Sequence, residues 1–252
     1  MNEEKGWFNM SLIGGFKRSK ISIKILYILI GAAIAIGIVS GIGSTCTTFD
    51  PIWWRNPSFS IIGDLQIIFI VTYIATWLTA ILWIVLFWAL SMGKNWFYKV
   101  ALFNSGIGIL GGAIPSGILF YEYWASYGNS GMRFTPSWFR TIMNLILLVV
   151  LLLPMIRREI HNTIKANRSI TGGSSGFETG LAQLAYVLIG FGIVLILQPF
   201  FMPATHIIDG INVGYDFEAL QFFGGLFSII LGLITRISGI VYSKVHTNKV
   251  AY

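Results

Sequence analysis

The chain has 252 residues, of which 55% are apolar and 11% are charged, and its formal net charge is +7. Soluble globular domains carry roughly 25% charged residues, so this composition excludes a soluble enzyme, a disordered chain and an ordinary nucleic-acid-binding protein. The single cysteine, Cys46, excludes an internal disulfide and a cysteine-rich metal cluster.

Six apolar stretches are long enough to cross a bilayer, which takes about 20 mostly apolar residues per helix. In chain order they cover residues 21–44, 62–92, 100–121, 138–156, 181–202 and 219–242. None of them shows the alternation of polar and apolar residues that is typical of barrel strands. The sequence therefore predicts an all-α fold, an integral membrane bundle of six transmembrane helices that forms one domain over residues 1–252.

Two less apolar segments accompany these spans. Residues 1–20 are expected to form a cytoplasmic or interfacial N-terminal segment, because their apolar residues recur at helical spacing above a basic end. The apolar stripe of such a short interfacial helix consists of Trp7, Phe8, Leu12 and Phe16. Residues 157–180 contain the run Gly-Gly-Ser-Ser-Gly, which is typical of flexible linkers, so they are expected to form a flexible cytoplasmic loop.

The distribution of basic residues predicts the orientation of the bundle. Fourteen of the 17 Lys and Arg residues fall on the side that holds both termini. The other side has Arg55, Arg133 and Arg140. Because Lys and Arg are enriched in cytoplasmic loops, we expect a multi-pass protein of the cell membrane with its N- and C-termini in the cytoplasm.

Glycines recur at helical spacing in two of the spans. Gly106, Gly108 and Gly111 match the G-x-G-x-x-G pattern by letter, but a dinucleotide site needs a strand before the motif, and here it lies inside a span. Small residues at such spacing allow close approach of membrane helices. The residues predicted to serve helix packing in this way are Gly37, Gly41, Gly106, Gly108, Gly111 and Gly112.

The spans contain few polar side chains. Those within the spans are Asn104, Asn144, Gln198 and Gln221, with Arg236 near the inner end of the last span. A proton-coupled transporter would place an acid or a histidine near the midplane, and none is evident, which weakens the pump and antiporter interpretations. A passive channel or a carrier of hydrophobic substrates stays open.

The outer face carries most of the acids and one histidine. Candidate ligands for a divalent metal there are His206, Asp209, Asp64 and Glu122. The alternative is that basic residues are depleted from outer loops and leave the acids behind, since this face has no second histidine to complete a typical transition-metal site. No residue is assigned a catalytic role, and the cofactor is left open.

Three functions fit these observations. The first is a non-catalytic accessory or scaffold subunit of a larger membrane complex, because no buried charge, metal cluster or nucleophile motif is recognised. The second is a small-solute channel or carrier. The third is a membrane enzyme with an outer-face site around His206 and Asp209. The expected partners are the lipid bilayer and other membrane subunits, and no nucleic acid.

Overall fold

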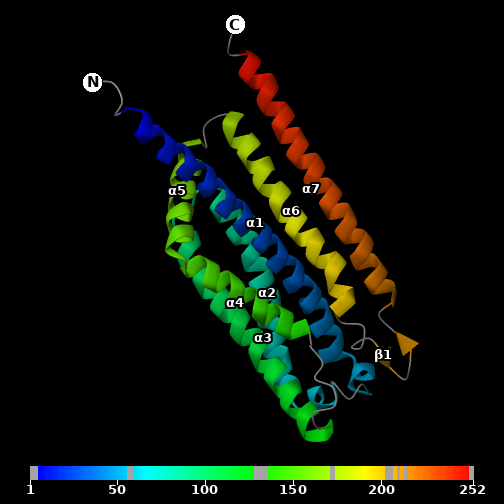
Figure 1. Cartoon of the computed structure of the whole chain (residues 1–252). Coiled ribbons are helices and arrows are strands. Elements are labelled where there is room, and N and C mark those ends of the chain that lie inside the picture. The colour runs from blue at the N-terminus through cyan, green and yellow to red at the C-terminus, as the bar shows by residue number, and fades with distance from the viewer. Residues whose placement is uncertain are drawn as a thin grey trace.

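The structure is built almost wholly of helices (Figure 1). It is a computed structural model, and it describes residues 5–55, 59–127, 136–170, 174–201, 207–208, 211–212 and 215–249. The elements are α1 (Lys5–Phe49), η1 (Pro51–Arg55), η2 (Ser60–Ile62), α2 (Gln66–Ser91), α3 (Phe97–Tyr127), α4 (Pro136–Leu152), α5 (Pro154–Ile170), α6 (Ser174–Phe201), β1 (Ile207–Ile208), β2 (Ile211–Asn212) and α7 (Tyr215–Lys249). The two short strands pair antiparallel, with Ile207 opposite Asn212.

Among the described residues, five helices are long and apolar enough to cross a membrane, and a sixth crossing is counted if the bent pair α4–α5 is one span. The five stretches are Ile21–Phe49, Gln66–Ser91, Phe97–Glu122, Gly180–Phe200 and Phe217–Val241. Helices of this kind indicate a multi-pass membrane protein.

The side chains of α2 are distributed as lipid requires, with apolar groups outside and polar groups inside. The exposed stripe of α2 consists of Ile67, Val71, Ile74, Leu78, Ile81, Val85 and Trp88. Its buried face carries Thr72, Thr76 and Thr79 instead. A helix in water would show the reverse pattern, so the arrangement supports a lipid environment.

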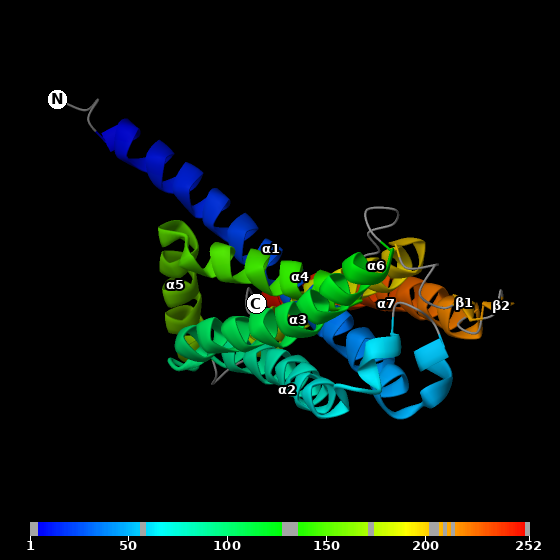
Figure 2. The same cartoon turned by 90° about the horizontal axis from the view of Figure 1, so that it is seen from below.

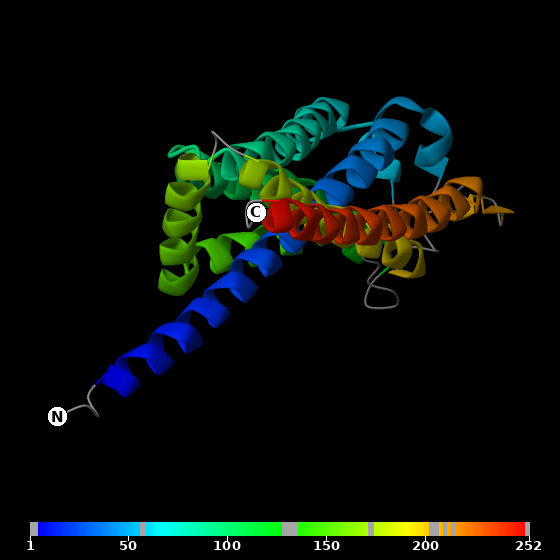
Figure 3. The same cartoon turned by 90° about the horizontal axis from the view of Figure 1, so that it is seen from above.

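α1 is longer than predicted and lies at the centre of the bundle. It packs against α2, α4, α5 and α6, and its apolar stretch begins at Ile21. Residues 5–20 continue the same helix and project beyond the other helices (Figures 2 and 3). This segment is therefore part of α1 and not a short helix of its own, while its place in the cytoplasm or at the membrane interface stays a prediction.

The fourth predicted span, residues 138–156, is interrupted. α4 ends at Leu152, and the chain bends by 79° before α5 begins at Pro154. Proline lacks the backbone N–H and suits the first position of a helix, which explains why a new helix starts here. Residues 157–170, expected within a flexible loop over 157–180, are helical, and α6 already begins at Ser174.

α5 closes one end of the bundle. Its buried face carries Ile156, Ile160 and Ile164 at helical spacing. Asn167 donates a hydrogen bond from Nδ2 to the main-chain oxygen of Leu90, 3.0 Å away, near the end of α2. We call this the α5 end, and the opposite end, where η1 and η2 lie, the η end. α1 begins and α7 ends at the α5 end (Figure 1).

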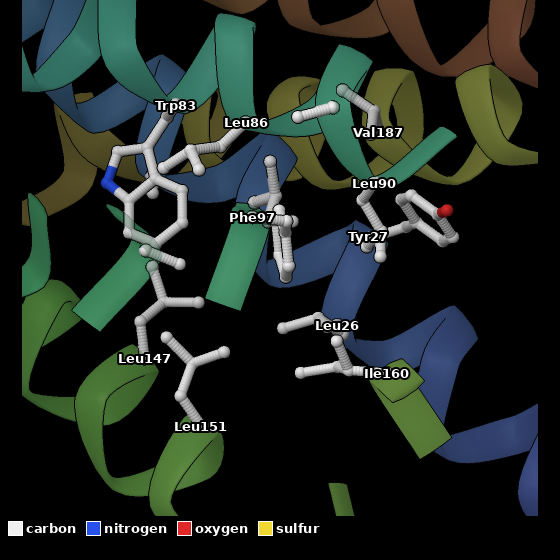
Figure 4. Close-up of a cluster of buried hydrophobic side chains, with 14 of the residues drawn as sticks. Leu26, Tyr27, Trp83, Leu86, Leu90, Phe97, Leu147, Leu151, Ile160 and Val187 are labelled. Atoms are coloured by element: carbon white, nitrogen blue, oxygen red, sulfur yellow. The ribbon is translucent and has the colours of Figure 1, made fainter. Parts of the chain in front are cut away.

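The main apolar core lies in the half of the bundle nearer the α5 end. Side chains from six helices point toward one another there (Figure 4). They include Leu26, Tyr27, Trp83, Leu86, Leu90, Phe97, Leu147, Leu151, Ile160 and Val187. A smaller cluster of Phe59, Ile62, Phe69 and Leu119 holds η2 against α2 and α3 at the η end.

α1, α6 and α7 approach one another at glycines. A Cβ added to Gly31 would collide with the main-chain oxygen of Val187, and one added to Gly190 with that of Ile28, so α1 and α6 touch backbone to backbone. α6 and α7 do the same at Gly192 and Gly225, where each added Cβ would lie within 2.7 Å of the main-chain oxygen of the other glycine. These contacts bring the backbones close enough for Cα–H···O interactions.

Candidate polar site between α2, α3 and α4

Buried polar side chains gather on the facing sides of α2, α3 and α4. They are Thr72, Thr76, Thr79, Asn104, Ser105, Ser116, Arg140 and Asn144. The threonine hydroxyls donate to carbonyls of their own helix, for example Thr76 to Thr72 at 2.7 Å. Their hydrogen-bonding needs are therefore met without a partner from another helix.

Two asparagines join the helices to one another. The indole nitrogen of Trp83 on α2 donates to Oδ1 of Asn144 on α4, at 3.2 Å. Nδ2 of Asn144 donates in turn to the main-chain oxygen of Arg140, at 2.9 Å. On α3, Nδ2 of Asn104 donates to the main-chain oxygen of Thr79, at 3.2 Å. These bonds fix the positions of the three helices, because buried polar groups in a membrane strongly favour a bonded geometry.

Glycines of α3 make room for α4. A Cβ added to Gly108 would collide with the side-chain amide of Asn144. One added to Gly112 would lie 2.8 Å from the main-chain oxygen of Ser137 and would collide with the hydroxyl of Thr141. The first turns of α4 therefore pack directly on the backbone of α3.

Arg140 is the one charged side chain that the structure buries among these groups in the part of the chain whose side chains are described. It is 2% exposed, and its Nη2 donates to the main-chain oxygen of Gly111. Its Nε and Nη1 have no hydrogen-bond partner in the described residues. A guanidinium has five N–H donors, one on Nε and two on each Nη, so three donors stay unpartnered.

The guanidinium lies deep in the bundle. Gly111 stands near the middle of the apolar stretch Phe97–Glu122. A Cβ on Gly111 would be 3.7 Å from Nη2 of Arg140 and 3.3 Å from the Cβ of Ala75, which lies well inside α2. Although Arg140 begins only one turn into α4, its charge is therefore near the mid-depth of two neighbouring helices.

The prediction that Arg140 is an outer flanking residue, and that the spans are almost free of ionisable groups, is therefore wrong. The spacing of residues along α4 could have indicated that Arg140 is buried. Arg140, Asn144, Leu147 and Leu151 are spaced four, three and four residues apart, which puts all four on one face. Because Leu147 and Leu151 are core residues, Arg140 had to share the buried face.

The predicted metal ligands are not brought together by what the structure describes. His206 and Asp209 lie outside the described residues. Asp64 is exposed in the turn before α2, and Glu122 is half-buried near the end of α3. Within the described part of the chain, no group of three His, Cys, Asp or Glu side chains could hold a metal ion.

The remaining glycines of the predicted packing set differ among themselves. A Cβ on Gly37 would lie 2.7 Å from the Cβ of Ala80, and one on Gly41 would lie 2.7 Å from the ring of Trp77. A Cβ on Gly106 would meet no atom within 4 Å. Gly106 therefore marks no close helix contact among the described residues, whereas Gly31 and Gly190, which the pattern did not single out, do.

Comparison with protein families, curated proteins and solved structures finds no match to this chain. The α2–α3–α4 site combines a deeply buried cation with three donors that have no partner among the described residues.

Proposed function

We propose that the chain is a six-span protein of the cell membrane with both termini in the cytoplasm. In this topology the fourth crossing includes α4, whose first turn packs against Gly112 near the middle of the α3 span and whose last turn reaches the α5 end. α5 then lies along the cytoplasmic surface, with its isoleucines on the bundle and Arg157, Arg158 and Lys165 beside the headgroups. The strong excess of basic residues at the α5 end supports this orientation.

Cysteine labelling tests the topology. On a background without Cys46, a cysteine at Ser174 should react with a membrane-impermeant maleimide only after the membrane is broken. Labelling of Ser174→Cys in intact cells would reverse the orientation.

For the function we propose a small-solute channel or carrier whose solute enters the α2–α3–α4 site from the outside. The observation that carries this proposal is the buried guanidinium of Arg140, three of whose donors find no partner in the part of the chain that the structure describes. Charged side chains at membrane depth are costly, and in membrane proteins they mark ion and substrate pathways. A protein selected for stability alone would have an apolar residue at this position.

An accessory or scaffold subunit is the second candidate. α7 favours this candidate. Only 17% of its most apolar stretch is buried, compared with 67% for the stretch in α1. A broad apolar face of α7 is therefore free to contact lipid or another subunit. Arg140 favours it less, because at 2% exposure the guanidinium is reached only when the bundle opens, and a small solute needs a smaller opening than the carboxylate of a partner helix. An enzyme built on His206 and Asp209 has no support from the described residues.

Osmotic swelling of proteoliposomes tests the proposal. Purified protein is reconstituted and challenged with gradients of urea, glycerol or potassium nitrate, the last with valinomycin to carry the potassium. We expect at least one solute to enter faster than in protein-free liposomes, and Arg140→Gln to abolish the difference. Arg158→Gln, which changes an exposed arginine of α5, is the control. Entry rates equal to those of empty liposomes for all three solutes would refute a transport role.

A further inference from the structure

We infer that the solute bound at Arg140 is a small monovalent oxyanion, of the carboxylate or nitrate type. This inference rests on the proposed function, because it names the chemical class of the solute that the α2–α3–α4 site takes.

The charge at the site decides the sign and the valence of the ligand. Within the described residues no carboxylate accepts a hydrogen bond from Arg140; its partner is the main-chain oxygen of Gly111. A buried charge without a counter-charge is strongly unfavourable. One monovalent anion neutralises one guanidinium, whereas a divalent anion would leave a net negative charge in the same apolar surroundings.

The free donors decide the shape of the ligand. The unpartnered N–H groups lie on Nε and Nη1, and all five donors of a guanidinium are in one plane. Nε and Nη1 do not form a parallel pair with each other, but each does so with Nη2, whose second N–H is not needed for the bond to Gly111. A planar oxyanion can accept one hydrogen bond from Nε or Nη1 and a parallel one from Nη2, which a spherical ion cannot do. The neighbouring Asn144 is a positioning residue, because both its oxygen and its nitrogen are already bonded, to Trp83 and to the main chain of Arg140.

Depth distinguishes a free anion from a lipid headgroup, which offers related chemistry. The guanidinium is bonded at Gly111, near the middle of the apolar stretch of α3, and the side chain is 2% exposed. A phospholipid headgroup stays at the membrane surface, about half of the ~30 Å hydrocarbon thickness away. The depth of the site therefore favours a small anion that enters the bundle alone over a lipid headgroup.

Thermal unfolding in a neutral detergent tests binding directly, because a ligand of the folded state raises its stability as the ligand concentration exceeds Kd. The melting temperature of the full chain is measured against sodium formate and sodium nitrate, with sodium sulfate at equal ionic strength as the divalent reference. We expect a saturable upward shift with formate and nitrate in wild type and Arg158→Gln, and its loss in Arg140→Gln. An equal shift in Arg140→Gln, or a shift produced by phosphatidylglycerol and by neither small anion, would overturn the inference.

Arg140→Lys provides a second test in case Arg140→Gln does not fold. Lysine keeps the charge but loses the planar pair of donors, so binding should weaken by about one hydrogen bond, or roughly tenfold in Kd. Anion affinity unchanged in Arg140→Lys would contradict a planar two-bond contact.

The swelling and unfolding experiments separate the two proposals. Saturable anion binding without faster entry of any of the three solutes would uphold the anion site and refute transport. Entry of urea or glycerol that depends on Arg140, without any anion-specific shift in melting temperature, would uphold transport and refute the anion.

Discussion

The bundle contains two groups of helices that are held together by different means. α1, α6 and α7 meet through glycines, with main-chain atoms in contact at Gly31, Gly190, Gly192 and Gly225. α2, α3 and α4 also include a close contact, at Gly108 and Gly112, but they enclose buried polar side chains and are joined by hydrogen bonds that cross from helix to helix. Figure 1 shows α6 and α7 on one side of α1 and α3 and α4 on the other.

The difference shows which group is suited to bind a ligand. Where the backbones of α1, α6 and α7 touch at these glycines, no space is left between the helices for a ligand. In the α2–α3–α4 group, hydrogen bonds position the helices and Arg140 retains unused donors. Substitutions should therefore act on stability in the first group and on both stability and binding in the second.

The largest effect is expected at Gly31. In Gly31→Ala the new methyl group would overlap the main-chain oxygen of Val187, and main chain cannot move aside as a side chain can. Overpacking of this kind typically costs 1–3 kcal/mol or more, so we expect a loss of about 3 kcal/mol in the free energy of unfolding. Thermal unfolding in detergent measures it, with Gly106→Ala as the matched control in open space. Similar melting temperatures for the two variants would remove the contrast between the groups.

The next effect is expected at Asn144. In Asn144→Leu the indole N–H of Trp83 loses its acceptor, and a buried donor without a partner costs about 1–3 kcal/mol. Introducing Trp83→Phe removes the donor as well, so the cost of Asn144→Leu should be smaller on that background. Additive losses in the double-mutant cycle would show that this hydrogen bond does not join α2 to α4.

A smaller effect of opposite sign is expected at Arg140. Arg140→Gln removes an uncompensated charge from the interior and keeps an amide that can still donate to Gly111, so stability without ligand should rise by about 1 kcal/mol. Thermal unfolding without added anion measures it. A clear loss of stability would mean that Arg140 serves the fold rather than a ligand.

The smallest effect is expected at Thr76. Its hydroxyl bonds its own helix, at 2.7 Å from the main-chain oxygen of Thr72, and valine has nearly the same shape. Thr76→Val should change the unfolding free energy by less than about 0.6 kcal/mol and leave anion binding intact. Loss of the nitrate-induced shift in Thr76→Val would add this hydroxyl to the site.

The sequence predicts the positions of the spans well because each is a long apolar run, and the helices found begin and end within a few residues of most of them. It predicts α5 poorly, because α5 is amphipathic and its isoleucines recur only every four residues. Hydropathy averaged over a window long enough to detect a span therefore does not show this helix. The register of Arg140 with Leu147 and Leu151 was readable from the chain. The contact of Gly31 with Val187 was not, because a glycine pattern does not say which helix faces it or which of 28 glycines is buried against a backbone.

The apolar cluster at the α5 end has a consequence for the rate of any transport. Leu147 and Leu151 lie two and three turns beyond Arg140 along α4, where they meet Phe97 and Leu26 (Figure 4). In a channel or carrier of the proposed kind, a solute that leaves the guanidinium toward the α5 end would meet this apolar cluster, which offers little to replace its hydration shell. Turnover would then be limited by movement of α4 and α5 about the break before Pro154, on the timescale of helix rearrangement rather than of diffusion through an open pore.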